Sequence, residues 1–292
     1  MCIRDRDTSV RCWGEGLAVS YMDPMSARAG TDQANAPPED QRVPTPVPGL
    51  ERVVQLALGS FHTCALLADT SVRCWGAGGA GELGGGARGA LHADLPVAVR
   101  LLRGVAEIAA GGSHTCARTL AGTVLCWGAN ADGQLGDGTT TDRAVPTMVR
   151  GIPVVVQLAA GSSHTCARTA EGAVWCWGAN TFGQLADGTT APRALPVQVP
   201  ELAGVVELAA GFGQQTCARS REGAVRCWGR DRWHSAPREV EGVRGAAQVA
   251  TGPGRVCVLT ERAEVLCWGN NIRGQLGDGT QVDRMAPTRV EF

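Results

Sequence analysis

The stretch GSSHTCARTAEGAVWCWGANTFGQLADGTT, residues Gly161–Thr190, decides the fold because its pattern recurs along the chain. Its tripeptide Cys-Trp-Gly occurs six times, and successive copies lie 40 to 62 residues apart. The copies begin at Cys12, Cys74, Cys126, Cys176, Cys227 and Cys267. A pattern repeated at this spacing indicates an array of equivalent modules, so a motif found in every module belongs to the framework.

Each module is predicted to contain four short β-strands. An apolar run such as VVVQLAAG at Val154–Gly161 comes first, and HTCART, a glycine turn, AVWCWG, a glycine-rich loop and a segment begun by a proline follow. Gly, Asn, Asp and Pro interrupt these runs before a helical period can develop. Four strands in about 50 residues are typical of a blade of an all-β propeller, whereas β-solenoid repeats are usually shorter.

The modules predict a single β-propeller domain over residues 1–292. Its expected divisions are a partial first blade with a long loop at 1–49, then blades at 50–100, 101–150, 151–200, 201–241 and 242–292. The first module begins at Cys2 without an apolar lead strand, and the opening MCIRDR predicts a truncated or assembled gene fragment. A blade without its lead strand would leave the ring open, with exposed strand edges.

Composition disfavours several classes of partner. The 27 basic residues, all arginine, nearly balance 28 acidic residues, and the formal net charge is −1. Because such a chain has no strong positive field, we expect no binding to nucleic acid. No apolar run reaches the roughly 18 residues of a membrane helix, so no membrane insertion is expected. The N-terminal residues also lack the apolar core of a signal peptide.

Five pairs of cysteines share a spacing of ten residues, which predicts disulfides within hairpins. In a hairpin centred on Ala121, with Gly122 left-handed, Thr119 pairs with Thr123, and counting outward places Cys116 opposite Cys126. Opposite Cα atoms in a non-hydrogen-bonded pair lie about 4.5 Å apart, which suits a disulfide. The predicted bridges are Cys64–Cys74, Cys116–Cys126, Cys166–Cys176, Cys217–Cys227 and Cys257–Cys267, and Cys2–Cys12 is a candidate sixth.

Buried free thiols are the main alternative to these bridges, because cysteine also packs as a small apolar residue. A zinc site is disfavoured, since its ligands usually include a close pair of cysteines. A reactive cysteine would occur once rather than in every module. Disulfides would place the protein outside the cell, in the periplasm or at the cell surface.

Several repeated motifs resemble functional sites. His62, His114 and His164 each precede a cysteine by two residues, which allows a Cys–His dyad but favours hydrogen bonds to backbone between neighbouring blades. GAGGAG at residues 76–81 matches a dinucleotide loop, but it aligns with the ordinary blade turn and no helix is expected after it. The GDGT and ADGT segments each offer one aspartate followed by glycine, which favours a structural role for the aspartate in a turn over calcium binding. The Trp of Cys-Trp-Gly is expected to pack between blades, and we predict no cofactor, metal or catalytic residue.

Residues that break the repeat are the candidates for recognition. One loop is shortened to GRDRWHSAP and groups Arg230, Arg232, Trp233 and His234, while the same module carries Phe212 at its entry. The first loop is lengthened and holds the single tyrosine, Tyr21. Arg and Trp are frequent interface anchors, so these six residues are predicted to bind a protein partner, and drift in a degenerate blade is the alternative.

One pattern recurs in register over residues 50–290: His-Thr, a glycine turn and Trp-Gly-x-Asn-x-x-Gly-Gln-Leu. This pattern resembles the repeat of the regulator of chromosome condensation family. The resemblance implies a propeller of typically seven blades, of which six Cys-Trp-Gly units are present here. It also implies activities that differ between branches: guanine-nucleotide exchange on a small GTPase with chromatin binding, or inhibition of β-lactamase by a secreted bacterial propeller. The functional residues of neither branch match positions in this chain.

We therefore predict a non-enzymatic, extracytoplasmic propeller of the bacterial, cysteine-paired type. It is expected to bind an unidentified protein, with cell-envelope proteins the first to test, as a monomer through loops on one face. The alternative is an intracellular exchange-like or chromatin-type scaffold with reduced cysteines, and the third is a propeller enzyme with a central cleft. Neutral charge disfavours chromatin, and the lack of paired carboxylates outside the repeat disfavours an enzyme.

Overall fold

A computed structural model describes residues 2–4, 9–12, 45–86, 92–200, 202–229 and 234–291. The described residues form six antiparallel sheets and no helix, which confirms the all-β propeller prediction. Blade 1 has three strands, and blades 2 to 6 have four each. Within every four-stranded blade, the strands pair in chain order, so the sheet is a simple meander.

The strands are as follows. Blade 1 contains β1 (Cys2–Arg4), β2 (Val10–Cys12) and β3 (Thr45–Pro46). Blade 2 contains β4 (Val53–Leu58), β5 (His62–Leu67), β6 (Val72–Ala77) and β7 (His92–Ala98). Blade 3 contains β8 (Val105–Ala110), β9 (His114–Thr119), β10 (Val124–Gly128) and β11 (Arg143–Met148). Blade 4 contains β12 (Val155–Ala160), β13 (His164–Thr169), β14 (Val174–Gly178) and β15 (Arg193–Gln198). Blade 5 contains β16 (Val205–Ala210), β17 (Gln215–Ser220), β18 (Val225–Gly229) and β19 (His234–Glu239). Blade 6 contains β20 (Ala246–Gly252), β21 (Arg255–Thr260), β22 (Val265–Gly269) and β23 (Arg284–Arg289).

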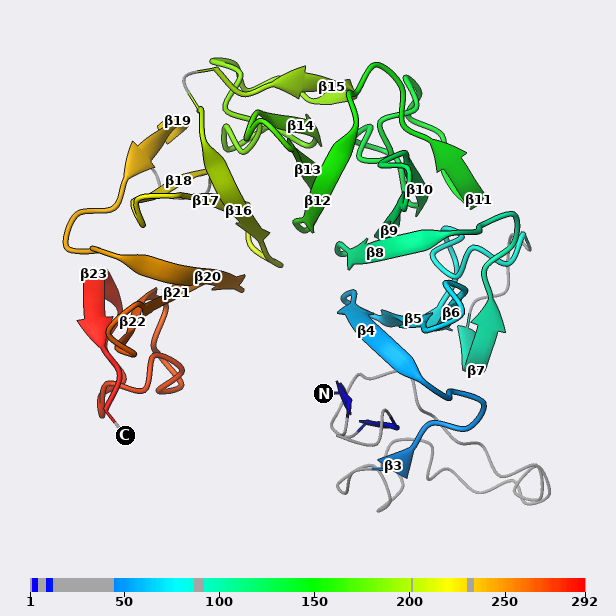
Figure 1. Cartoon of the computed structure of the whole chain (residues 1–292), viewed down its shortest axis with the longest axis horizontal. Helices are drawn as coiled ribbons and strands as arrows, with labels where there is room; N and C mark the ends of the chain where they lie inside the picture. Colours follow the sequence, from blue (N-terminus) through cyan, green and yellow to red (C-terminus); the bar gives the residue numbers. More distant parts are fainter. Residues whose placement is uncertain are drawn as a thin grey trace, which may run out of the picture.

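The blades lie side by side along an open arc (Figure 1). The first strand of each four-stranded blade points toward the middle of the arc, and the fourth strand lies on its outside. The apolar core is divided among the spaces between blades, because each cluster of buried side chains draws on two neighbours. Trp127 of blade 3, for example, packs with Cys64, Leu66 and Val72 of blade 2.

Two glycines of blade 3 have conformations that other residues rarely adopt. Gly122 turns the second hairpin of blade 3 with φ of 79°, and the Thr119 N–H donates to the Thr123 carbonyl at 2.9 Å. Gly128, the last residue of Cys-Trp-Gly, has φ of 101° at a break in register between β10 and β11. A Cβ at Gly128 would lie 2.6 Å from the Ser113 carbonyl oxygen, so only glycine fits.

Strand direction gives each blade two distinct ends. The first and third strands of a blade run in the same direction, because each is antiparallel to the second. These two strands therefore end at the same edge of the blade, which we call the loop face. It carries the loop from the first to the second strand and the loop from the third to the fourth strand. The opposite end, the hairpin face, carries the hairpins between second and third strands and the connectors between blades.

Candidate binding surface

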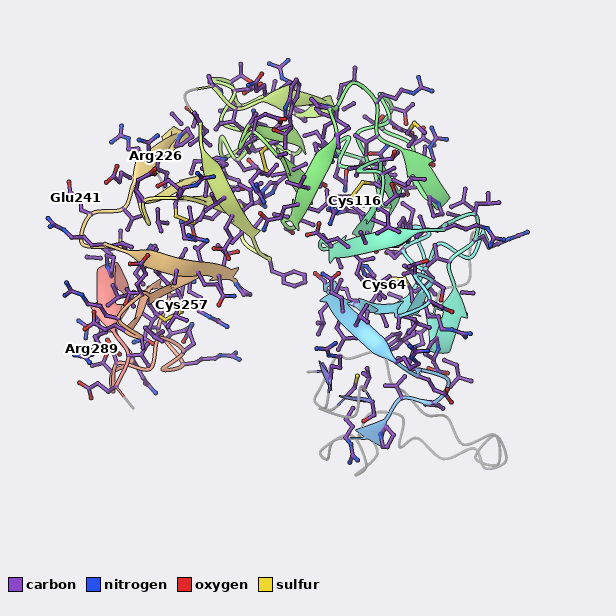
Figure 2. The ribbon with its side chains drawn as sticks, viewed as in Figure 1. Cys64, Cys116, Arg226, Glu241, Cys257 and Arg289 are labelled. Carbon is purple, nitrogen blue, oxygen red and sulfur yellow. A yellow bond between two sulfur atoms is a disulfide. The ribbon has the colours of Figure 1, made fainter. Side chains whose placement is uncertain are left out.

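The five cysteine pairs are joined in the structure. In each pair the two cysteines lie directly opposite in the register of the second and third strands. Their Cα atoms are 4.1 to 4.2 Å apart, and the sulfur atoms are bonded. Cys64 and Cys116 lie in the interior of their blades (Figure 2), and neither is exposed. The backbone register also places Cys2 opposite Cys12, but the Cys2 side chain lies outside the described part, so a sixth bridge stays a prediction.

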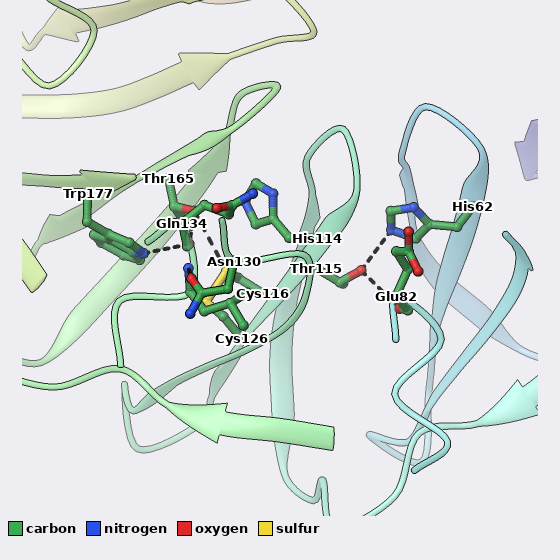
Figure 3. The surroundings of a disulfide bond; sticks show 11 residues. His62, Glu82, His114, Thr115, Cys116, Cys126, Asn130, Gln134, Thr165 and Trp177 are labelled. Atoms are coloured by element: carbon green, nitrogen blue, oxygen red, sulfur yellow. Dashed lines mark hydrogen bonds between the residues drawn. A yellow bond between two sulfur atoms is a disulfide. The ribbon is translucent and has the colours of Figure 1, made fainter. Parts of the chain in front are cut away.

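The repeated histidines join neighbouring blades, but through a side chain rather than the backbone that we expected. Nε2 of His114 lies 2.9 Å from Oγ1 of Thr165 in blade 4, and His62 makes the same contact with Thr115 (Figure 3). The Thr165 hydroxyl donates to the Gln134 carbonyl at 3.0 Å, so His114 Nε2 carries the hydrogen and donates to Thr165. The threonine hydroxyl is the partner because the backbone N–H and C=O groups of the strands are already hydrogen-bonded within their own sheets. A Cys–His dyad is excluded because these cysteines are bonded to each other.

The tryptophans of Cys-Trp-Gly lie between blades, as predicted. Trp127, Trp177 and Trp228 are at most 2 % exposed. Each indole N–H donates to a main-chain carbonyl in the long loop of the preceding blade, at 2.7 to 2.9 Å. A buried indole of this kind fixes the distance between blades and satisfies its own polar atom. This arrangement gives these tryptophans a structural role.

The aspartates of the GDGT turns are occupied by contacts within the turn. Oδ1 of Asp137 accepts hydrogen bonds from the Thr139 N–H and hydroxyl, and Oδ2 lies 2.7 Å from the Arg143 guanidinium. Burial alone would raise the pKa of Asp137, but hydrogen bonds from Thr139 and Arg143 lower it below its ordinary value. The same contacts recur at Asp187 and Asp278. These contacts support the turn interpretation, and the described residues contain no cluster of three or more metal-ligating side chains.

A buried asparagine holds each of these turns closed, which the sequence analysis did not single out. The Asn130 side chain is fully buried, and its Oδ1 accepts from the Leu135 N–H at 2.9 Å. Its Nδ2 donates to the carbonyls of Thr139 and Thr141 at 3.0 and 3.1 Å. The signal that could have revealed it is the recurrence of Asn at residues 130, 180 and 271, five positions before a leucine.

Replacing Asn130 by alanine is expected to lower the free energy of unfolding by about 3 kcal/mol, because three backbone groups lose a buried partner. Thermal unfolding of the variant and of the parent checks this. The matched control is Asn270→Ala, since Asn270 is exposed and its side chain lies against Gly254 instead of inside a turn. An equal change in both variants would contradict the structural role of Asn130.

Only part of the predicted recognition cluster lies in the described residues. Phe212 follows β16 on the loop face and is half-buried. Tyr21, Arg230, Arg232 and Trp233 lie outside the described residues, and of His234 only the backbone, in β19, is described. Strand β18 ends and strand β19 begins at the loop face, which is the end of the blade that also carries Phe212.

The loop face carries two further phenylalanines that the sequence analysis did not select. Phe61 follows β4 and is 64 % exposed, and Phe182 follows β14 and is 50 % exposed. All three phenylalanines of the described ranges thus lie in loops at this face, while the tryptophans of Cys-Trp-Gly fill the interior. For Phe61, the sequence signal was a departure from the repeat. Blade 2 has Phe61 at the position where blades 3 and 4 have Ser113 and Ser163.

The stacked, disulfide-closed blades define a β-propeller built from sequence repeats. Two sequence profiles described as regulator of chromosome condensation (RCC1) repeat match the chain, one at residues 71–118, 121–168, 171–218 and 263–292, the other at 53–82, 105–134, 155–184 and 246–275. The chain therefore belongs to the RCC1 repeat family. Within the described ranges, no helix is long and apolar enough to cross a membrane.

Relatives of known sequence and structure share this fold. The chain is 34 % identical over 265 residues to human E3 ubiquitin-protein ligase HERC2, a match that covers 83 % of this chain and 5 % of HERC2. It is 39 % identical over 113 residues to the Arabidopsis thaliana ultraviolet-B receptor UVR8, covering 37 % of this chain and 25 % of UVR8. Human WBSCR16 superposes with a TM-score of 0.78 at 25 % identity, covering 85 % of this chain and 71 % of that one. Yeast RCC1 (Prp20), in a crystal structure with Kap60, superposes with a TM-score of 0.77 at 21 % identity over 100 % of this chain and 72 % of that one.

Proposed function

We propose that this RCC1-repeat propeller is a non-enzymatic scaffold that binds a protein through its loop face, in an extracytoplasmic compartment. The observation that carries the proposal is the exposure of Phe61 and Phe182 on that face. Aromatic side chains at a surface are frequent anchors for protein partners. Yeast RCC1 (Prp20), which shares the fold, is bound to the protein Kap60 in its crystal structure.

The polar chemistry of the interior supports a scaffold rather than an enzyme. The repeated histidines are buried and hydrogen-bonded to threonines, and the paired cysteines are bonded to each other. Asp137, Asp187 and Asp278 are ion-paired to arginines in their own turns. These groups serve the framework in successive blades, which leaves them unavailable for catalysis.

The disulfides support an extracytoplasmic location, because such bonds persist in oxidising compartments and are rare in the cytosol. Alkylation of the unreduced, denatured protein from its native source, followed by intact mass, tests this. Protection of the ten cysteines in the five pairs is expected. Alkylation of all of them would overturn the location and favour an intracellular scaffold.

Binding through the loop face is tested by site-specific photo-crosslinking. A benzophenone amino acid replaces Phe61 or Phe182, and a matched control replaces Leu195, which is 49 % exposed on the outer strand β15. A protein crosslinked from the envelope fraction at both loop-face positions, competed by unlabelled propeller and absent from the control, is the expected result. Equal crosslinking from all three positions would contradict the assignment of this face.

A further inference from the structure

The hairpin face of blade 3 exposes three aliphatic side chains that other blades lack. Leu101 is 81 % exposed, Leu120 is 74 % exposed and Val154 is 66 % exposed. In chain register, Leu101 stands where other connectors have Gly49, Gly151, Glu201 and Gly242. Leu120 corresponds to Ala68, Ala170, Arg221 and Glu261, and Val154 corresponds to Arg52, Gly104, Gly204 and Gly245. The framework therefore does not need an aliphatic residue at any of these positions. We call the three residues the blade 3 patch.

The segments that carry these side chains are joined to each other. The Leu120 N–H donates to the carbonyl of Gly104, in the Leu101 connector, at 2.8 Å. The Val155 N–H donates to the carbonyl of Gly122, in the Leu120 hairpin, at 3.1 Å. A Cβ placed on Gly122 would lie 2.5 Å from Cγ1 of Val154, so the Val154 side chain rests on the hairpin turn. The hairpin thus lies between the two connectors, and the three side chains share one end of one blade.

The backbone at Leu101 adds independent evidence, because leucine is unfavourable there. Its φ is 58°, in the left-handed region where Gly49, Gly151 and Gly242 have φ of 75°, 69° and 83°. A non-glycine residue in this conformation costs about 1 kcal/mol or more. Since the Leu101 side chain is exposed, its packing contacts within the fold offset little of this unfavourable backbone energy. Among the described residues with positive φ, Leu101 is the only large aliphatic one. A strained and exposed apolar residue is a feature of binding surfaces.

The same segments carry positive charge only. Arg100, Arg103 and Arg150 are exposed, and none forms an ion pair in the described structure. Residues 99–104, 119–123 and 149–154 contain no Asp or Glu. The equivalent hairpins of the other four-stranded blades carry Asp69, Glu171, Glu222 and Glu261. A partner at this patch would therefore meet aliphatic surface flanked by unpaired guanidinium groups.

We propose that the blade 3 patch is a docking site for a protein segment that presents aliphatic side chains next to aspartate or glutamate. The aliphatic residues would supply buried apolar area, and the arginines would pair with the carboxylates. The site lies on the face opposite to Phe61 and Phe182, so it is separate from the loop-face function proposed above. A membrane surface fits less well, because the patch is confined to one blade and lacks the Trp or Tyr residues common at lipid interfaces.

The test is selection of a phage-displayed library of random linear peptides on the whole propeller. A triple variant, Leu101→Gly, Leu120→Ala and Val154→Gly, serves for counter-selection. Each substitution introduces a residue that another blade has at the same position, so the variant should fold, and Leu101→Gly relieves the left-handed strain. The matched control is Met285→Gln, which removes an 85 % exposed apolar side chain from β23 in blade 6. Circular dichroism and thermal unfolding establish that each variant is folded.

The expected peptides combine aliphatic residues with Asp or Glu. They should bind the triple variant at least about tenfold more weakly than the parent, and the Met285→Gln control as tightly as the parent. Reversing the charges with Arg100→Glu, Arg103→Glu and Arg150→Glu should weaken binding of the same peptides. Peptides without acidic residues, or peptides bound equally by the triple variant, would overturn the proposal.

Two further measurements decide between other occupants. Binding of the parent, but not the triple variant, to vesicles containing phosphatidylglycerol without any patch-dependent peptide would identify a membrane surface and overturn the proposal. Sedimentation that shows self-association of the parent, abolished in the triple variant, would identify a second copy of the chain and likewise overturn it. The loop-face crosslinks at Phe61 and Phe182 are expected to persist in the triple variant, so failure of one proposal does not imply failure of the other.

Discussion

Acidification from pH 7 to pH 5 is expected to lower the free energy of unfolding by about 5 kcal/mol, mainly through three buried histidines. His62, His114 and His164 are at most 2 % exposed. Burial lowers the pKa of His62 and His164 to about 4 and that of His114 to about 3, from an ordinary value of 6.5. Nδ1 of His114 and of His164 has no partner, so a proton added there would be buried without an acceptor.

The direction of this effect follows from proton uptake. The unfolded histidines take up protons as the pH falls through 6.5, whereas the folded ones stay neutral until the pH approaches 4. The unfolded state therefore binds more protons in this window, and stability falls with the pH. A tenfold difference in proton affinity corresponds to about 1.4 kcal/mol, which gives about 2 kcal/mol for each histidine between pH 7 and pH 5. Glu82 acts in the opposite sense, because burial raises the pKa of its carboxyl group.

Urea unfolding at the two pH values measures the effect. Blade 5 has Gln215 at the position of these histidines, so a triple variant with His62→Gln, His114→Gln and His164→Gln uses a residue that the fold already accepts. This variant should lose most of the pH dependence between pH 7 and pH 5, since glutamine does not titrate. The control is His92→Gln, which replaces an exposed histidine of the outer strand β7, away from the interfaces that the three histidines join. A parent protein whose stability is the same at both pH values would show that the histidines do not hold the blades together as neutral groups.

Replacing Cys116 and Cys126 together by alanine is expected to lower the free energy of unfolding by about 3 kcal/mol. The bond closes a short hairpin, and the chain-entropy estimate for a loop of this length is about 2 to 3 kcal/mol. Both cysteines are fully buried, so lost packing of the sulfur atoms adds to this. Five such bonds would contribute as much as the whole stability of a typical domain, so complete reduction is expected to unfold the protein.

Differential scanning calorimetry of the double variant should show a melting temperature lower by about 10 °C. The matched control is the double variant Cys257→Ala and Cys267→Ala, which has the same sequence separation of 10. Cys257 at the end of the arc is only half-buried, so this control keeps the entropic effect and loses less packing. A smaller loss of stability is expected there. An unchanged melting temperature in the Cys116/Cys126 variant would contradict the contribution assigned to the bond.

Much of each blade could be predicted from the sequence because its contacts are local. The hairpin of Cys116 and Cys126 is set by a glycine turn between them, and the register follows by counting along two adjacent strands. The role of the GDGT aspartates also follows from neighbours within six residues, Thr139 and Arg143 for Asp137. Turn chemistry and strand alternation act over such short separations, so they can be recognised without the fold.

For the contacts between blades, the sequence predicted which types of residue take part but not which residues pair. The sequence indicated that the histidines and tryptophans lie at blade interfaces, but not that His114 would bond to Thr165, 51 residues away. The exposure of Phe61 and of Leu101 could not be predicted either. Whether an apolar residue in a loop is exposed or buried depends on which residues of the neighbouring blade pack against it. Comparing equivalent positions of the repeats would have marked both residues as departures, without showing their exposure.

The sequence by itself therefore determined the repeat, the four-stranded blade and the pairing of the cysteines, since each depends on residues close together in the chain. Only the tertiary structure decided which polar groups meet across the interfaces and which irregular side chains remain at the surface. Those features depend on how blades about 50 residues apart stack along the arc, and that stacking brings together atoms that no local pattern relates.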